Sequence, residues 1–284
     1  MSSLEQQPEF QAPLLPFPNS FNEFLHAFII APIVILVYNL WKDKVAMMLF
    51  VSLKDKLMFK WIALSVMFPI LFDIMGVSTG AWTFNESKSI TSSIIPIEEV
   101  GFIIGCVLLC FCWTLKIFTI LIKELESGIV IISPTDNKHV YFLFKYLMYG
   151  LYSTIFISGC YMFHCYWSKN DQTLFVASVI CLTFPLFLIW QWWLGCDKFI
   201  RFPSYWLYSW LAPGVYLYII ERVGDIQQIF KTNDIYSLNS SNTGGTTMIH
   251  VEYFFLFIFS ANLCSGMFWP QLVESVGPAT HLRK

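Results

Sequence analysis

The chain has 284 residues, of which 56% are hydrophobic and 13% are charged, and its mean hydropathy is +0.61. A soluble domain carries roughly a quarter charged residues, so this composition excludes an ordinary soluble domain and favours a protein that lies in a lipid bilayer. The net charge of −2 and the lack of basic runs exclude a nucleic-acid partner.

The first 21 residues are polar and proline-bearing, with no Lys or Arg ahead of the first apolar run. A secretory signal peptide begins with a positively charged region. We therefore interpret residues 1–21 as a polar N-terminal segment and do not expect a cleaved signal.

Seven apolar stretches follow, each close to the roughly 20 residues that a membrane-crossing helix needs. They lie near 22–41, 61–80, 95–115, 141–163, 173–195, 205–221 and 249–269. The run Val45–Leu53 is too short to cross and is expected at the interface or as an extension of the first helix. The sequence predicts an all-α integral membrane protein with about seven transmembrane helices.

Lys and Arg are distributed unevenly between the connections. Twelve fall in the first, third and fifth connections and the tail, and four fall in the connections on the other side. Because cytoplasmic loops carry the excess of Lys and Arg, we predict a multi-pass protein with a non-cytoplasmic N-terminus and a cytoplasmic C-terminus.

Two parts of the chain share a pattern of an acid, an aromatic residue and a second acidic segment. Nine residues separate Asp73 from Trp82 and, later, Glu221 from Phe230. The next spans open with Pro96-Ile97-Glu98-Glu99 and with His250-Val251-Glu252-Tyr253. Helices 2–3 and 6–7 would run the same way, which predicts parallel repeats with a site between them. The expected divisions are a first repeat 22–123, a connecting segment 124–172 with helix 4, a second repeat 173–270 and a cytoplasmic tail 271–284.

Five acids lie at or within the ends of predicted spans: Asp73, Glu98, Glu99, Glu221 and Glu252. A carboxylate in hydrocarbon is costly, and such residues mark functional sites by default. Two structural explanations stay open. Asp73 and Glu221 could reach headgroup water at a helix end, and the two adjacent glutamates could be first-turn acids favoured by the helix dipole after Pro96.

Paired acids in a poorly hydrated site indicate proton chemistry. Two close carboxyl groups cannot both ionise easily, so one stays protonated and can donate a proton to an alkene. Its ionised neighbour can stabilise a carbocation or remove a proton afterwards. Aromatic faces also stabilise cations, and Trp82 lies within the repeated pattern. The histidines are scattered and no D-D-x-x-D array occurs, so we expect no metal site.

Asp73, Gly80 and Trp82, followed by Pro96-Ile97-Glu98-Glu99, together resemble the signature of the membrane lycopene cyclases. A later stretch resembles the second unit of the fungal form of that family. It runs from Phe184-Pro185 to Trp192 and continues through Leu211-Ala212-Pro213, Tyr218 and Glu221. The resemblance extends over residues 25–270.

The resemblance implies a redox-neutral enzyme that closes an acyclic lycopene end to an ionone ring without a cofactor. The catalytic acids it implies are the pair Glu98 and Glu99, the supporting acid Asp73, and the second-repeat acids Glu252 and Glu221. The substrate-binding positions it implies are Trp82, Phe230, Pro96 and His250. Tyr253 stands where a second glutamate is expected, so the second acid pair is half present.

Other interpretations stay open. The same chemistry could act on another prenylated substrate of meroterpenoid type. The chain could instead be a non-catalytic carotenoid-binding protein or one subunit of a heteromer, and acids within spans also fit a transporter. The expected partners are the lipid bilayer and a lipophilic polyene or prenylated substrate, with a homo- or hetero-oligomer left open.

Overall fold

The structure is a computed structural model that describes residues 20–52, 56–79, 82–84, 89–90, 95–129, 136–169, 172–226, 230–232 and 251–275. The first apolar stretch is one continuous helical rod. It consists of α1 (Phe21–Leu25), the π-helix η1 (His26–Ile30) and α2 (Ala31–Trp41). Ser20 starts this rod, because its side chain accepts a hydrogen bond from the Glu23 N–H at 3.2 Å.

The remaining elements follow in chain order. They are α3 (Lys44–Ser52), α4 (Lys56–Ser78), β1 (Trp82–Phe84), α5 (Ile97–Glu126), α6 (Asp136–Lys169), α7 (Gln172–Trp193), the 3₁₀-helix η3 (Lys198–Arg201), α8 (Pro203–Ile226), β2 (Phe230–Thr232) and α9 (Val251–Ser275). A helix lies at each of the predicted spans, and the short run after the first span is the separate helix α3.

Within the described residues, four helical segments are long and apolar enough to cross a membrane. They are Phe21–Trp41, Ile97–Glu126, His139–Trp167 and Phe175–Trp193. The structure therefore confirms a helical protein with the character of a multi-pass membrane protein. Helices α5 and α6 have 30 and 34 residues. Both helices extend beyond the predicted spans, because helical backbone hydrogen bonding continues into the polar residues at the ends of the apolar stretches.

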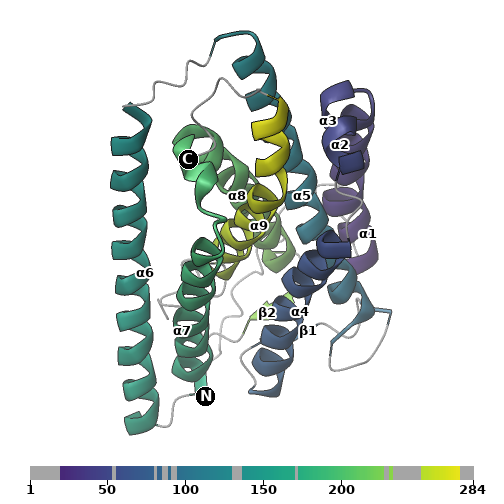
Figure 1. Ribbon diagram of the computed structural model, residues 1–284. Coiled ribbons are helices and arrows are strands. Elements are labelled where there is room, and N and C mark those ends of the chain that lie inside the picture. Colours follow the sequence, from purple (N-terminus) through teal and green to yellow (C-terminus); the bar gives the residue numbers. More distant parts are fainter. Residues whose placement is uncertain are drawn as a thin grey trace, which may run out of the picture.

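Helix α5 is the centre of the bundle and α6 is its edge. In the most apolar stretch of each helix, 67% of the residues are buried in α5 but only 11% in α6. Helix α6 packs beside α7 (Figure 1). Leu143 and Trp167 on α6 are 67% and 79% exposed, and Trp193 at the end of α7 is 87% exposed. Soluble monomers rarely expose apolar patches larger than a few hundred Å², so these outer faces suit contact with lipid.

The first rod packs closely on α5 at two glycines. A Cβ atom added to Gly101 would lie 3.3 Å from Leu25 Cδ2, and one added to Gly105 would lie 2.2 Å from Ile29 Cγ2. Glycines four residues apart face the same side of a helix and let another helix approach its backbone, a frequent arrangement in membrane proteins. These contacts fix the first rod against the N-terminal half of α5.

Buried polar side chains connect α7, α8 and α9. Gln191 donates to the Phe259 carbonyl at 2.9 Å and accepts from Asn262, which in turn accepts from Trp206 Nε1 at 3.0 Å. Each buried amide thus has a partner on a neighbouring helix.

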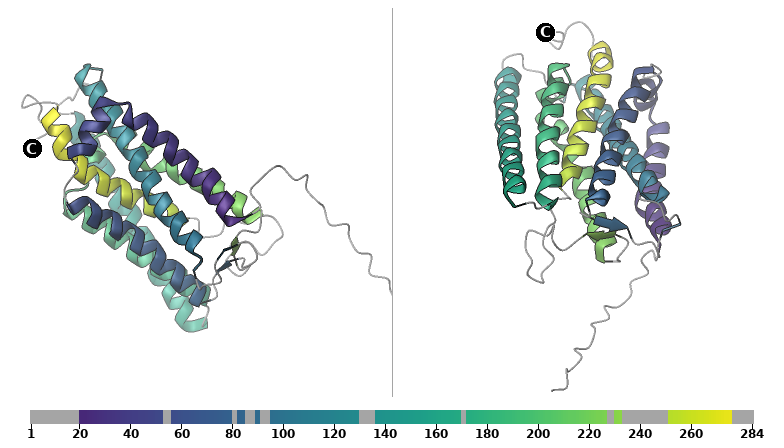
Figure 2. Two further views of the ribbon diagram at one scale, coloured as in Figure 1. Left: turned by 90° about the vertical axis from the view of Figure 1, so that its right-hand side faces the viewer. Right: turned by 90° about the horizontal axis from the view of Figure 1, so that it is seen from below.

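Two three-residue strands, which the sequence did not predict, lie at one end of the bundle (Figure 2). They pair antiparallel, with Trp82 opposite Thr232, Thr83 opposite Lys231, and Phe84 opposite Phe230. The first residue of each strand thus faces the last residue of the other, and the middle residues face each other. A two-fold rotation about the middle pair exchanges the strands. The strands link α4 to α5 and α8 to α9, so two helix–strand–helix segments meet here.

Candidate active site

The first turn of α5 places two acids in the protein interior. Pro96 is the N-cap, is itself buried, and accepts the Glu99 N–H at 3.0 Å through its carbonyl oxygen. Glu98 and Glu99 are 3% and 4% exposed. Carboxylates are favoured at a helix N-terminus, but an acid that only served the dipole would remain in contact with water. Both side chains are instead enclosed by the protein.

Three acids from three helices form a buried group, here called the acid cluster: Asp73 on α4, Glu99 on α5 and Glu221 on α8. Asp73 and Glu99 form a side-chain hydrogen bond, and Glu221 is close enough to Asp73 to interact electrostatically. A hydrogen bond between two carboxyl groups requires a proton on one of them, because a carboxylate only accepts. The cluster is therefore able to hold a proton at an apolar site.

Glu98 points elsewhere. Its Oε1 accepts a hydrogen bond from the Ile90 N–H in the segment between β1 and α5. Its Oε2 is buried and has no hydrogen-bond partner in the described part of the chain. Neighbouring residues on a helix lie about 100° apart, so Glu98 and Glu99 face different surroundings. The structure joins Glu99 to Asp73 and Glu221, and it joins Glu98 to the loop backbone.

Cys106 and Tyr216 extend the site away from the acids. The Cys106 thiol is fully enclosed on α5 and interacts electrostatically with all three members of the acid cluster. Tyr216 on α8 interacts in the same way with Cys106, and its hydroxyl donates to the Phe28 carbonyl of the π-helix at 2.7 Å. Cys106 lies in a buried cluster against which Tyr216 packs, between the first turn of α5 and the middle of the bundle.

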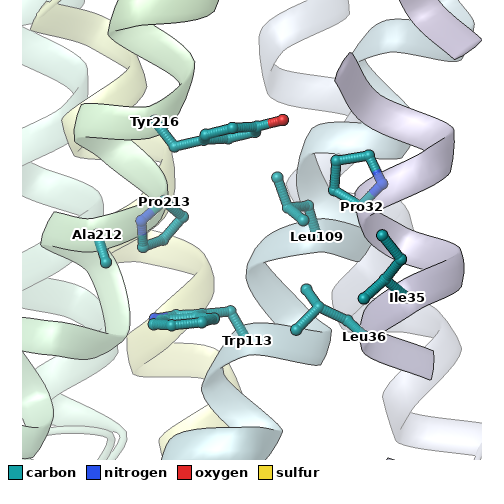
Figure 3. A pocket seen from close by; sticks show the side chains of 8 residues that line it. All are labelled: Pro32, Ile35, Leu36, Leu109, Trp113, Ala212, Pro213 and Tyr216. Atoms are coloured by element: carbon teal, nitrogen blue, oxygen red, sulfur yellow. The ribbon is translucent and has the colours of Figure 1, made fainter. Parts of the chain in front are cut away.

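An apolar groove begins at Tyr216, with a volume of about 380 Å³. Its lining comes from α2, α5 and α8: Pro32, Ile35, Leu36, Leu109, Trp113, Ala212, Pro213 and Tyr216. Figure 3 shows the Tyr216 ring at one end of the groove, the Trp113 indole at the other, and Leu109 between them. The groove and the acid cluster share helices α5 and α8.

The opposite end of the bundle carries acids with cationic or hydroxyl partners. Asp43 pairs with Lys123 at 2.6 Å, and the buried Asp197 pairs with Lys145 and accepts from Tyr141. The Tyr205 hydroxyl donates to Glu124. The Arg201 guanidinium lies over the rings of Tyr141 and Trp269, 5.6 and 5.8 Å from their centroids. We call this group of charges the basic end.

Several predicted site residues lie partly or wholly outside the described structure. The backbones of Trp82 and Phe230 belong to the paired strands, and Glu252 lies in the first turn of α9, but the side chains of all three are outside the described set. His250 is outside the described residues altogether. Among the residues that are described, no three His, Cys, Asp or Glu side chains are arranged as metal ligands.

Sequence reasoning missed Cys106 and the groove. The cysteines fall mostly in apolar runs, where a small buried side chain needs no functional explanation. Tyr216 lies in a span without a polar neighbour. One signal was available. Glu99, Cys106 and Trp113 are spaced by seven residues, which is close to two helical turns and places all three along one face of α5.

Searches against protein-family models, curated proteins and solved structures found no match to this chain.

Proposed function

We propose that the chain is a seven-span membrane cyclase that closes an end of lycopene, or of a related carotene, to an ionone ring through a carbocation. The observation that carries this proposal is the hydrogen bond between the buried acids Asp73 and Glu99, beside Glu221. A protonated acid in apolar surroundings can protonate an alkene, which offers no other polar group for recognition.

The site lies where two equivalent units meet. We propose that α4–β1–α5 and α8–β2–α9 are parallel repeats, supported by their common element order and by the two-fold register of the strands. Asp73 and Glu221 then occupy equivalent positions, each nine residues before the first residue of its strand. Membrane proteins built from repeats often bind substrate at the repeat interface, which accounts for the meeting of these two acids.

The chemistry needs one proton donor and one proton acceptor. The Asp73–Glu99 pair gives its proton to the terminal double bond, leaving a tertiary cation. The inner double bond attacks that cation, and the new ring carbon–carbon bond moves the positive charge into the ring. A carboxylate of the cluster then removes a ring proton, which forms the new double bond. The reaction is an isomerisation, so no oxidant, reductant or cofactor is consumed.

The charge distribution sets the proposed orientation. The basic end contains Lys123, Lys145 and Arg201, and Lys and Arg are enriched on the cytoplasmic side of membrane proteins. We therefore propose that the basic end faces the cytoplasm, that the N-terminus is non-cytoplasmic, and that the acid cluster lies near the non-cytoplasmic side.

The test is expression of the chain in lycopene-accumulating cells, with pigments separated by chromatography. The wild-type chain should yield products with one or two rings. Glu99→Gln should reduce them at least about hundredfold, since general acid–base groups contribute roughly 10²–10⁴ in rate. Glu126→Gln is the matched control, because it alters an exposed acid at the far end of the same helix and should leave the yield unchanged.

Three other outcomes would each reject part of the proposal. Unchanged lycopene despite membrane expression would reject the carotenoid substrate and direct attention to other prenylated substrates or to a missing partner subunit. Equal ring formation by the wild type and Glu99→Gln would reject the acid cluster as the proton donor. Lycopene bound but never cyclised would identify a carotenoid-binding protein.

A further inference from the structure

The apolar groove has a regular construction. Each of its three helices contributes a pair of residues four positions apart: Pro32 and Leu36 from α2, Leu109 and Trp113 from α5, and Ala212 and Tyr216 from α8. Residues at this spacing lie above one another on one helix face. The groove is thus about one helical turn, roughly 6 Å, in extent along the helices, and its outer wall includes Ile35, which is 61% exposed.

The hydrogen-bond donors on the lining side chains of the groove are both engaged within the protein. Only Trp113 and Tyr216 carry polar atoms there. The Trp113 Nε1–H donates to the Tyr208 carbonyl at 2.9 Å, and the Tyr216 hydroxyl donates to the Phe28 carbonyl at 2.7 Å. Ligand pockets normally keep a few polar groups to orient their ligand. A groove that is otherwise apolar and has no free donor favours a ligand without polar groups.

The walls also favour a rigid occupant. Pro32, Pro213 and the two aromatic rings have few rotamers, so the groove is preformed and loses little entropy on binding. A flat conjugated chain, itself rigid, gains most from such walls, whereas a flexible saturated acyl chain must be ordered first. The volume of about 380 Å³ lies within the range of roughly 300–1,000 Å³ for small-molecule sites. It accommodates a segment of such a chain.

The groove and the acid cluster lie along the same two helices, α5 and α8. Leu109 lies ten residues after Glu99 on α5, or about 15 Å along the helix, and Cys106 lies between them. Cys106 belongs to a buried cluster of side chains against which Tyr216 packs. A chain whose end lies at the acids must therefore extend about 15 Å along α5, past this cluster, to occupy the groove.

We propose that the groove between α2, α5 and α8 is the side entrance and tail-binding site for an unfunctionalised conjugated hydrocarbon that comes from the bilayer. This inference rests on the proposed function and adds the place where the non-reacting part of the substrate binds. The reacting end lies at the acid cluster, and the remainder of the chain leaves through the groove into lipid.

Retention of pigment tests the groove separately from catalysis. Each variant is built in the Glu99→Gln background and purified in detergent from lycopene-accumulating cells, and lycopene per mole of protein is read from its absorbance. Ala212→Trp fills the groove from α8, and Ile35→Trp fills it from α2. Val215→Trp is the control, because Val215 is 43% exposed on α8 and does not line the groove. Size-exclusion chromatography checks folding.

Both groove variants should retain at least tenfold less lycopene than the parent, while Val215→Trp retains as much. Equal retention by all variants would overturn the proposal, and so would equal loss in Val215→Trp. The proposal also fails if native mass spectrometry shows that the occupant displaced by Ala212→Trp is a phospholipid. If the wild type never forms rings but the groove variants alone lose pigment, the cyclase proposal fails and the groove stands. If the wild type forms rings, and Ala212→Trp forms as many rings and retains as much lycopene, the cyclase proposal stands and the groove proposal fails.

Discussion

At one end of the bundle, Asp73 is hydrogen-bonded to another acid, Glu99, with Glu221 close by. At the opposite end, the equally buried Asp197 is paired with Lys145. Both ends enclose carboxyl groups within apolar helices, where an unpaired charge is costly. The basic end reduces that cost with a cation, as a structural ion pair does, whereas the acid cluster reduces it by sharing a proton.

On the proposed function, this difference separates a site arranged for stability from one arranged for chemistry. Residues that form a reactive group in a buried site usually make the fold less stable than other residues would at the same positions. A conservative change from acid to amide should therefore have opposite consequences at the two ends. It should abolish function and spare folding at the acid cluster, and it should spare function and weaken folding at the basic end.

The largest expected effect is that of Asp73→Asn on turnover. Asparagine keeps the shape and can still hydrogen-bond to Glu99, but it removes the shared acid proton. Ring formation in lycopene-accumulating cells should fall at least about hundredfold. The midpoint of thermal unfolding in detergent should stay the same or rise, since a buried acid beside two others is replaced by a neutral group. A large fall in the midpoint would instead assign Asp73 a structural role.

The next effect in size is that of Asp197→Asn on stability. Removing one partner of a buried ion pair costs about 3–5 kcal/mol, and the Lys145 side chain is 25% exposed, so we expect a loss near the lower limit. Thermal unfolding in detergent measures it, and turnover per folded molecule should be unchanged.

A double variant sharpens this measurement. Asp197→Asn combined with Lys145→Met removes both charges and should recover most of the lost stability, because the cost arises from the unpaired lysine. If the double variant is as unstable as the single one, the loss comes from other contacts of Asp197, such as that with Tyr141, and not from an unpaired lysine.

The helices and the segments that carry the acid cluster were predictable because they follow from local properties of the chain. A membrane span needs a run of apolar residues, and every predicted span is a helix in the structure. The nine-residue spacing of Asp73–Trp82 and Glu221–Phe230 indicated equivalent segments, and the strands of those segments do pair.

The partners of individual acids were not predictable from spacing. The resemblance paired Glu98 with Glu99, whereas the structure joins Glu99 to Asp73 and directs Glu98 to the Ile90 N–H. This depends on the rotation of α5 about its axis, which hydropathy does not fix. The groove depends on three helices that are far apart in sequence, and the π-helix that supplies the Phe28 carbonyl has no hydropathy signal.

A smaller effect tests whether the acid cluster depends on the close packing of the first rod. Gly105→Ala would place a Cβ atom 2.2 Å from Ile29 Cγ2, so the rod must shift. Overpacking of this kind costs about 1–3 kcal/mol, and water admitted near the acids should also lower turnover. The control is Gly150→Ala on α6, where nothing lies within 4 Å and alanine should raise stability by about 0.5–1 kcal/mol. Equal behaviour of the two variants would exclude a contribution from this packing.

The smallest effect concerns the exposed ion pair at the basic end. Burial alone would raise the pKa of Asp43. The hydrogen bond and charge of Lys123 and the N–H groups of Val45 and Ala46 outweigh it, so the pKa lies below its ordinary value of 3.8. An acid whose pKa is lowered by folding stabilises the fold above its unfolded pKa, and this stabilisation is lost as the pH falls through the lowered value.

Lys123→Gln removes that contribution. Because the Lys123 side chain is 51% exposed, the loss at neutral pH should be below about 1 kcal/mol. The difference in thermal midpoint between wild type and variant should be constant from pH 7 down to the ordinary pKa of Asp43 and should shrink below it. A difference that is already absent at pH 7 would mean that Asp43 is protonated in the folded protein. The basic end would then hold its acids as the acid cluster does, with a proton in place of a cation.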